Sequence, residues 1–218
     1  MYSGIIFDFD GVLYDSEKHW EKIENRYLIE RVPGWDPYEY KHLIGHSLPE
    51  AYTYLKNRGL RLTEEQYFAD YHKMAMELYA NYAKPLQNIE TLLRRLSIRK
   101  TKMAVASSSK RIWIDTALHN SALPIDFTVI VSGDDKSVAK GKPAPDVYLR
   151  AAELLGEQTS KLIAIEDSKN GVTSAKAAGL YCFGLRNGFN ETQDLSEADD
   201  IIHGYTPQNM KKILSFII

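Results

Sequence analysis

The strongest constraint on the fold is a set of five short apolar runs, rich in β-branched residues, that recur along the chain. They occupy residues 4–7, 103–106, 128–131, 162–165 and 181–185. Such runs, without polar alternation, are typical of strands buried on both faces of a parallel sheet. Segments with helical spacing lie between most of them, at 88–98, 111–120, 145–155 and 169–178. The alternation predicts an α/β fold: a doubly wound, Rossmann-like parallel sheet with helices on both faces.

Residues 16–85 interrupt this alternation, because they show helical patterns and many aromatic residues but no convincing buried strand. We therefore predict that they form an inserted helical cap domain. The α/β core, which carries the catalytic groups, would then consist of residues 1–15 and 86–218. We expect the cap to fold over the carboxyl edge of the sheet, where ligands bind in open α/β folds.

Polar and acidic side chains follow four of the predicted strands directly. In chain order they are Asp8 and Asp10 after the first run, Ser107 after the second, Gly133, Asp134 and Lys142 after the third, and Glu166 and Asp167 after the fourth. Because the carboxyl ends of parallel strands meet at one edge of a sheet, four separate segments are expected to converge on one site.

The chemistry of these residues indicates a phosphate site that needs a metal. Asp8 and Asp10 are two residues apart in an extended segment, so their side chains point to the same side. With Glu166 and Asp167 they would concentrate up to four negative charges, which calls for a hard cation such as Mg²⁺. Lys142 supplies a positive charge and Ser107 (with its neighbour Ser108) a hydroxyl, both suited to phosphoryl oxygens.

A phosphoryl group held in this way can be attacked in line by a carboxylate, and water can then resolve the covalent intermediate. We assign the attack to Asp8. Asp10 would protonate the departing alkoxide and then accept a proton from the hydrolytic water. The sequence thus predicts a phosphohydrolase with an aspartyl-phosphate intermediate.

The same residues stand in four motifs that resemble those of the haloacid dehalogenase superfamily, and the motifs together span nearly the whole chain. They are DFDGVLYDSE at 8–17, VASSSK at 105–110, GKPAPDVY at 141–148 and IEDSKNGVTSAKAAG at 165–179. The resemblance implies that Glu166 and Asp167 hold Mg²⁺ together with the Asp8 carboxylate and the Asp10 main-chain carbonyl. Gly11, within the first motif, is a further phosphate-binding candidate.

Within the superfamily the chain resembles the branch of sugar-phosphate phosphatases and beta-phosphoglucomutases, whose third motif often reads GKPAPD. The mutases typically carry an arginine after the serine of a cap segment, where this chain has Leu48 after Ser47. They also tend to have a histidine where Trp20 stands, although His19 is adjacent. Both departures favour a phosphatase acting on a small phosphorylated metabolite such as a sugar phosphate. The alternative is a beta-phosphoglucomutase-like phosphoryl transferase.

Cap residues His19, Trp20, His46 and Ser47 are the candidates for substrate contact. Two further alternatives are a dehalogenase, which would not need the retained metal ligands, and a binding protein without catalysis. Other site types conflict with the local sequence. A calcium loop starting at Asp8 would need glycine at Leu13 and glutamate at His19, and Pro143 occupies the Ser/Thr position of a P-loop.

Charge and cysteine content limit the partners and the compartment. The net charge is −2 with both signs scattered, so we expect neither nucleic acid nor a membrane surface as partner. Cys182 is the single cysteine, which excludes an internal disulfide and favours the cytoplasm. The N-terminal residues lack the pattern of a secretory signal, and no apolar run reaches transmembrane length. We expect a monomer.

Overall fold

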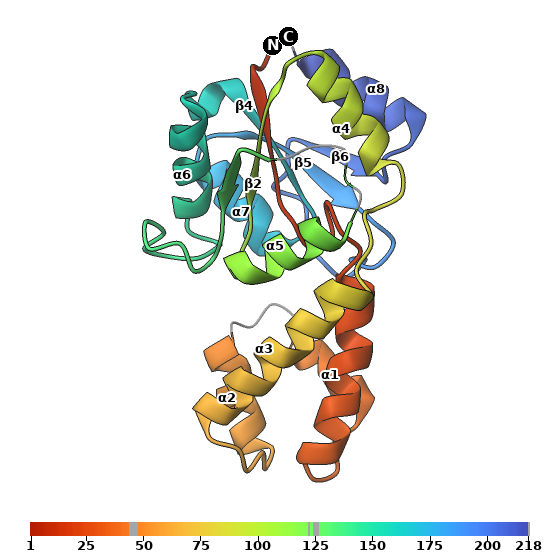
Figure 1. Cartoon of the computed structure of the whole chain (residues 1–218), viewed down its shortest axis with the longest axis vertical. Coiled ribbons are helices and arrows are strands. Elements are labelled where there is room, and N and C mark those ends of the chain that lie inside the picture. The colour runs from red at the N-terminus through yellow and green to blue at the C-terminus, as the bar shows by residue number, and fades with distance from the viewer. Residues whose placement is uncertain (44–47, 122, 124–126, 218) are drawn as a thin grey trace. The chain divides into compact units, whose positions relative to one another are not determined.

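The computed structural model describes residues 1–43, 48–121, 123 and 127–217 of the chain (Figure 1). The described chain divides into two compact units, Met1–Asp15 with Lys84–Ile218, and Ser16–Ala83. Each unit has its own secondary structure and its own apolar interior. Within the described residues, no helix combines the length and the apolar content that crossing a membrane requires.

The first unit is built on a six-stranded sheet with the order β3-β2-β1-β4-β5-β6, and all neighbouring strands are parallel. The strands are β1 (Gly4–Phe7), β2 (Lys102–Ala106), β3 (Val129–Val131), β4 (Leu162–Glu166), β5 (Tyr181–Arg186) and β6 (Asp200–His203). The predicted doubly wound α/β sheet is therefore confirmed. From β1 the chain adds β2 and β3 on one side and then β4, β5 and β6 on the other. Open α/β folds bind ligands at the carboxyl ends of the strands where the order switches in this way.

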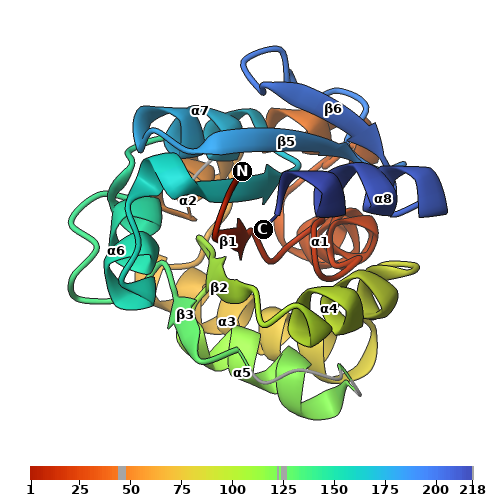
Figure 2. The same ribbon diagram turned by 90° about the horizontal axis from the view of Figure 1, so that it is seen from above.

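Helices cover both faces of this sheet. They are α4 (Ile89–Ile98), α5 (Arg111–Asn120), α6 (Asp146–Leu155), α7 (Lys169–Ala177) and α8 (Pro207–Phe216), with the short η2 (Thr159–Lys161) before β4. Figure 2 shows α6 and α7 on one side of the sheet and α4 and α8 on the other. One core cluster packs Val147, Tyr148 and Val172 from α6 and α7 against strand residues such as Ile6 and Ala164.

The sequence patterns predict five of the six strands but not β6 or α8. In β6 only Ile202 is buried, while its neighbour Ile201 is exposed, because this strand lies at the sheet edge. An edge strand needs no continuous apolar run: β3, at the other edge, nevertheless has one, whereas β6 has only two apolar residues between Asp200 and His203, too few for the pattern.

The second unit is helical, with α1 (Glu17–Arg31), η1 (Pro37–His42), α2 (Leu48–Asn57) and α3 (Glu64–Asn81). A capping box starts α3, since Gln66 N donates to Thr63 Oγ1 (3.2 Å) and Thr63 N donates to Gln66 Oε1 (2.9 Å). Many of the aromatic residues noted in the sequence form the interior of this unit, including Tyr27, Trp35 and Tyr67.

The two connections between the units run beside each other within the first unit. Asp15 N donates to Lys84 O (2.9 Å), and Lys84 N donates to Asp15 Oδ1 (2.7 Å). Tyr14 forms an antiparallel bridge with Pro85, and Leu86 N donates to Leu13 O (2.9 Å). The chain thus leaves the sheet unit and returns to it at one place.

Candidate functional site

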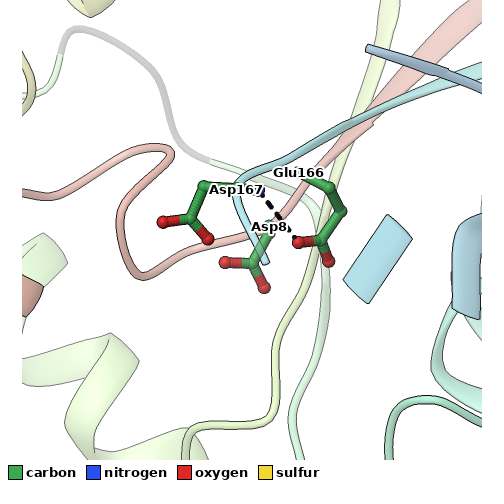
Figure 3. Close-up of side chains that lie close together, drawn as sticks. All are labelled: Asp8, Glu166 and Asp167. Carbon is green, nitrogen blue, oxygen red and sulfur yellow. Dashed lines mark hydrogen bonds between the residues drawn. The ribbon is translucent and has the colours of Figure 1, made fainter. Parts of the chain in front are cut away.

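The parallel register of β1 and β4 places Asp8 beside Glu166. Phe7 pairs with Ile165, and Asp8 N donates to Ile165 O (3.0 Å), so the residues that follow lie next to each other at the carboxyl ends of the strands. Asp167 comes directly after Glu166. Figure 3 shows the three carboxylates gathered side by side.

These three carboxylates form a buried acidic cluster. Each of Asp8, Glu166 and Asp167 offers an oxygen within 4.8 Å of the others, and their exposed fractions are 7%, 0% and 6%. Burying three carboxylates so close together is unfavourable unless cations compensate for them. All the offered donors are oxygens, which suit a hard divalent cation such as Mg²⁺. The cluster could therefore hold such an ion.

Lys142 supplies one compensating charge from the segment before α6. Its Nζ lies 2.5 Å from Asp8 Oδ1 and 2.5 Å from Glu166 Oε1, and it also donates to Ala106 O (3.1 Å). Burial by itself would lower the pKa of Lys142, but the two adjacent carboxylates outweigh burial and raise that pKa. Lys142 therefore stays charged.

Asp8 has an unusual titration environment. Burial raises the pKa of its carboxyl well above the ordinary value; Lys142 opposes this effect, while Glu166 and Asp10 add to it. One lysine thus leaves an excess of negative charge at the site. A bound cation would remove that excess and favour the ionised form of Asp8, which is the form that can act as a nucleophile.

Glu166 is held by donors on both of its oxygens. Tyr148 Oη donates to Oε1 (2.7 Å), and Asp167 N donates to Oε2 (3.1 Å). Gly171 in α7 packs directly against this carboxylate, since a Cβ at that position would lie 2.0 Å from Glu166 Cδ. A glycine is needed there for close approach. Tyr148 is a site residue that the sequence patterns did not single out.

The segment after β2 brings its serines to the same edge. Ser107 is buried and its Oγ accepts from Ser109 N (3.0 Å), whereas Ser108 is exposed. Ser109 Oγ donates to Asp10 Oδ2 (2.6 Å), which joins this segment to the one after β1. Ser109, the third serine of the run, was not among the predicted site residues.

Gly11 packs against Asp167, and Asp134 lies at the start of α5. Gly11 has φ +72°, and a Cβ there would meet Asp167 Oδ2 at 2.0 Å, so this position needs glycine on both grounds. Asp134 Oδ1 accepts from Arg111 N (2.8 Å) at the start of α5 and from Ser132 Oγ (2.7 Å). Asp134 thus satisfies the first main-chain N–H of α5 from another segment of the chain, since the N-cap residue Lys110 makes no side-chain capping bond.

The structure describes two of the four candidate residues of the helical unit, His19 and Trp20. Trp20 is 6% exposed and stacks on Tyr71 with ring centroids 4.8 Å apart, which favours a packing role. His19 lies against Tyr82, with ring centroids 6.0 Å apart. His46 and Ser47 fall outside the described residues. Their contact with a substrate stays a prediction.

A family model described as haloacid dehalogenase-like hydrolase matches residues 5–185, most of the chain. The protein is a haloacid dehalogenase-like hydrolase. The resemblance noted in the sequence is thereby confirmed, and so is the enzyme class, a phosphoric monoester hydrolase of the haloacid dehalogenase type, at the level of the family.

Individual relatives of this hydrolase have several different names. It is 30% identical to a putative phosphatase from Bacillus subtilis, over 100% of this chain and 98% of that protein. It is 27% identical to a bifunctional riboflavin kinase/FMN phosphatase from Arabidopsis thaliana, over 96% of this chain but only 55% of that longer protein. The crystal structure of a putative beta-phosphoglucomutase from Thermotoga maritima superposes on it with a TM-score of 0.79, at 25% identity, covering 99% of this chain and 100% of that one.

Proposed function

We propose that this hydrolase is a magnesium-dependent phosphatase that acts on a small phosphorylated metabolite through an aspartyl-phosphate intermediate. The observation that carries the proposal is the contact of Lys142 with both Asp8 and Glu166, inside a buried acidic cluster at the carboxyl ends of β1 and β4. This arrangement provides a nucleophile, a fixed cation and an oxygen-lined metal site within one small volume.

In the first step an Asp8 carboxylate oxygen forms a bond to phosphorus, and the bond from phosphorus to the leaving-group oxygen breaks. Asp10 gives its proton to that oxygen, so that an alcohol departs. Ser109 Oγ, 2.6 Å from Asp10 Oδ2, fixes the orientation of this acid. Lys142 and Ser107 are assigned to the phosphoryl oxygens, on which charge is concentrated during transfer.

In the second step a water molecule attacks the phosphorus of the aspartyl phosphate. Asp10 accepts a proton from that water, the bond from phosphorus to Asp8 breaks, and inorganic phosphate leaves with the carboxylate regenerated. Mg²⁺, when bound by Asp8, Glu166, Asp167 and the Asp10 carbonyl, supplies positive charge that offsets the carboxylates and the phosphoryl group. The Asp10 side chain ends the cycle in the protonation state in which it began.

A sugar phosphate is the proposed substrate class. The support is the resemblance of the third motif to sugar-phosphate phosphatases, together with a structural neighbour described as a putative beta-phosphoglucomutase. That neighbour also keeps phosphoryl transfer between two positions of one sugar as the second candidate function. Leu48, at the place of the arginine expected in a mutase, favours hydrolysis. A cytoplasmic location and a monomeric state remain predictions.

The deciding experiment measures phosphate release from sugar phosphates, nucleotides and a generic aryl phosphate, with Mg²⁺ and with excess chelator. We expect release that requires Mg²⁺ in the wild type and is reduced by at least about 10³-fold in Asp8→Asn. Activity retained by Asp8→Asn would overturn the mechanism. Isomerisation of a sugar phosphate that depends on a bisphosphate activator, without net phosphate release, would favour the mutase.

A further inference from the structure

We infer that Asn187, in the loop after β5, is a positioning residue that holds two of the proposed magnesium ligands in place. Its side-chain amide Nδ2 donates to Asp167 Oδ2 (2.9 Å) and to Gly11 O (2.8 Å). A primary amide has two N–H donors, and these two contacts account for both. The inference rests on the proposed function for the identity of the ion and for the Asp10 carbonyl as one of its ligands.

The two acceptors belong to segments that approach the cluster from different strands. Asp167 follows β4 and offers a carboxylate to the cluster. Gly11 follows Asp10, whose main-chain carbonyl is a proposed ligand, so a bond to Gly11 O restrains the peptide next to that carbonyl. One amide group therefore fixes a side-chain ligand and a main-chain ligand relative to each other.

The loop that carries Asn187 is itself tied to Asp167. Asn190, which is 5% exposed, donates from Nδ2 to Asp167 O (2.7 Å) and to Leu185 O (2.8 Å). Its Oδ1 accepts from Asn187 N (3.2 Å), and Asn187 Oδ1 accepts from Phe189 N (2.9 Å). These bonds determine the orientation of the Asn187 amide, so that its nitrogen faces the acidic residue.

Gly11, Asp167 and Asn187 pack so closely that no space remains for a side-chain atom at Gly11. A Cβ at Gly11 would lie 2.0 Å from Asp167 Oδ2 and 2.9 Å from Asn187 Nδ2. The contact is therefore a close packing of backbone, carboxylate and amide, in which a shift of one group moves the others. Groups that orient a metal ligand typically change metal affinity by about 10- to 100-fold when they are removed.

The test is direct Mg²⁺ binding by the full chain without substrate, measured by titration calorimetry. Asn187→Ala removes the donor, and Asn187→Leu removes it while keeping the branching and the number of side-chain heavy atoms, in case a cavity unfolds the first variant. Asn209→Ala is the matched control, because Asn209 Nδ2 likewise makes two hydrogen bonds, but to two main-chain carbonyls, His203 O (2.9 Å) and Gly204 O (3.0 Å). The melting temperature of each variant in excess chelator reports any loss of structural stability.

We expect both Asn187 variants to bind Mg²⁺ about 10- to 100-fold more weakly than the wild type. Asn209→Ala should bind within about twofold of the wild type, because the two acceptors of Asn209, His203 O and Gly204 O, are not among the proposed metal ligands. Mg²⁺ affinity unchanged in both Asn187 variants overturns the inference, and so does a wild type that binds no Mg²⁺. A fall in melting temperature alone would assign Asn187 a purely structural role, which also overturns it.

The outcome is separable from that of the proposed function. If Asn187 variants bind Mg²⁺ weakly but the wild type releases no phosphate from any compound, the inference holds and the phosphatase proposal fails. If phosphate release depends on Mg²⁺ while both Asn187 variants bind the ion normally, the phosphatase proposal holds and the inference fails.

Discussion

Lys142 Nζ lies 2.5 Å from Asp8 Oδ1, inside the protein and at the end of the central strand β1. The same nitrogen lies 2.5 Å from Glu166 Oε1. One ammonium group is therefore shared by two carboxylates, with a third, Asp167, beside them. When all three carboxylates are ionised, this lysine leaves two negative charges uncompensated, and these are the charges that the proposed Mg²⁺ would offset.

Removing this ammonium group should destabilise the fold strongly. Lys142→Met leaves Asp8 and Glu166 buried without their cation, which typically costs about 3 to 5 kcal/mol. The free energy of unfolding, measured with urea in the presence of chelator, should fall by that amount, and Mg²⁺ should restore part of it. Lys212→Met is the control, since its pair with Asp200 is half-exposed and should contribute less than about 1 kcal/mol. Equal losses in the two variants would contradict the assigned role of Lys142.

The hydroxyl of Tyr148 should matter more than that of another fully buried tyrosine. Tyr148→Phe removes a donor to the Glu166 carboxyl group, which also contacts the Lys142 ammonium, whereas Tyr205→Phe removes a donor to the main-chain carbonyl Val12 O (3.1 Å). A hydrogen bond to a charged acceptor contributes about 1.5 to 3 kcal/mol and a neutral one about 1 kcal/mol. Urea unfolding should therefore rank Tyr148→Phe as the less stable variant, and only that variant should also lose phosphate release. The reverse ranking would show that Tyr148 does not support Glu166.

Gly11→Ala should strongly reduce activity because the added Cβ would clash with Asp167, in addition to straining the backbone. Gly11 and Gly204 both have positive φ, +72° and +63°, so alanine at either position costs about 1 to 2 kcal/mol. Only at Gly11 would the added Cβ strike Asp167, because nothing lies within 4 Å of a Cβ at Gly204. Gly204→Ala should keep its rate of phosphate release, while Gly11→Ala should lose at least about 10²-fold. Full activity in Gly11→Ala would show that Asp167 can shift without consequence.

A buried carboxyl in the helical unit should make stability depend on pH. Glu24 accepts from Tyr40 Oη (2.7 Å); burial raises the pKa of Glu24 from 4.5 to about 7, against the smaller opposing effect of that bond. The neighbouring Tyr67 and Tyr71 also have raised pKa values, through burial and then through Glu24, so they stay neutral in this range.

The unfolded chain releases the Glu24 proton first, so the free energy of unfolding should fall as pH rises from 4.5 to about 7 and then level off. The total loss is on the order of 3 kcal/mol, at about 1.4 kcal/mol for each pH unit of that window. Glu24→Gln should abolish this component and be more stable than the wild type at pH 8, with little difference at pH 4. Parallel pH profiles of unfolding in the two proteins would rule out a raised pKa for Glu24.

The sequence predicts the inner strands and the catalytic edge because both depend on local patterns. A buried strand such as Leu162–Glu166 needs a continuous apolar run, and parallel strands place the residues that follow them at one edge. Tyr148, Ser109 and Asn187 carry no such signal. Each contacts an acidic residue that is distant in sequence. Such a contact depends on the tertiary structure, and a local sequence pattern does not predict it.

The paired connections at Asp15 and Lys84 give this architecture a modular character. The chain leaves and re-enters the sheet unit through neighbouring, hydrogen-bonded residues. In connectivity, Ser16–Ala83 is therefore inserted into that unit as a long surface loop would be. An insertion of another length or shape could replace Ser16–Ala83 without altering the register that sets Asp8 beside Glu166. Evolution can in this way vary the inserted helices while inheriting the acidic cluster of the sheet unit unchanged.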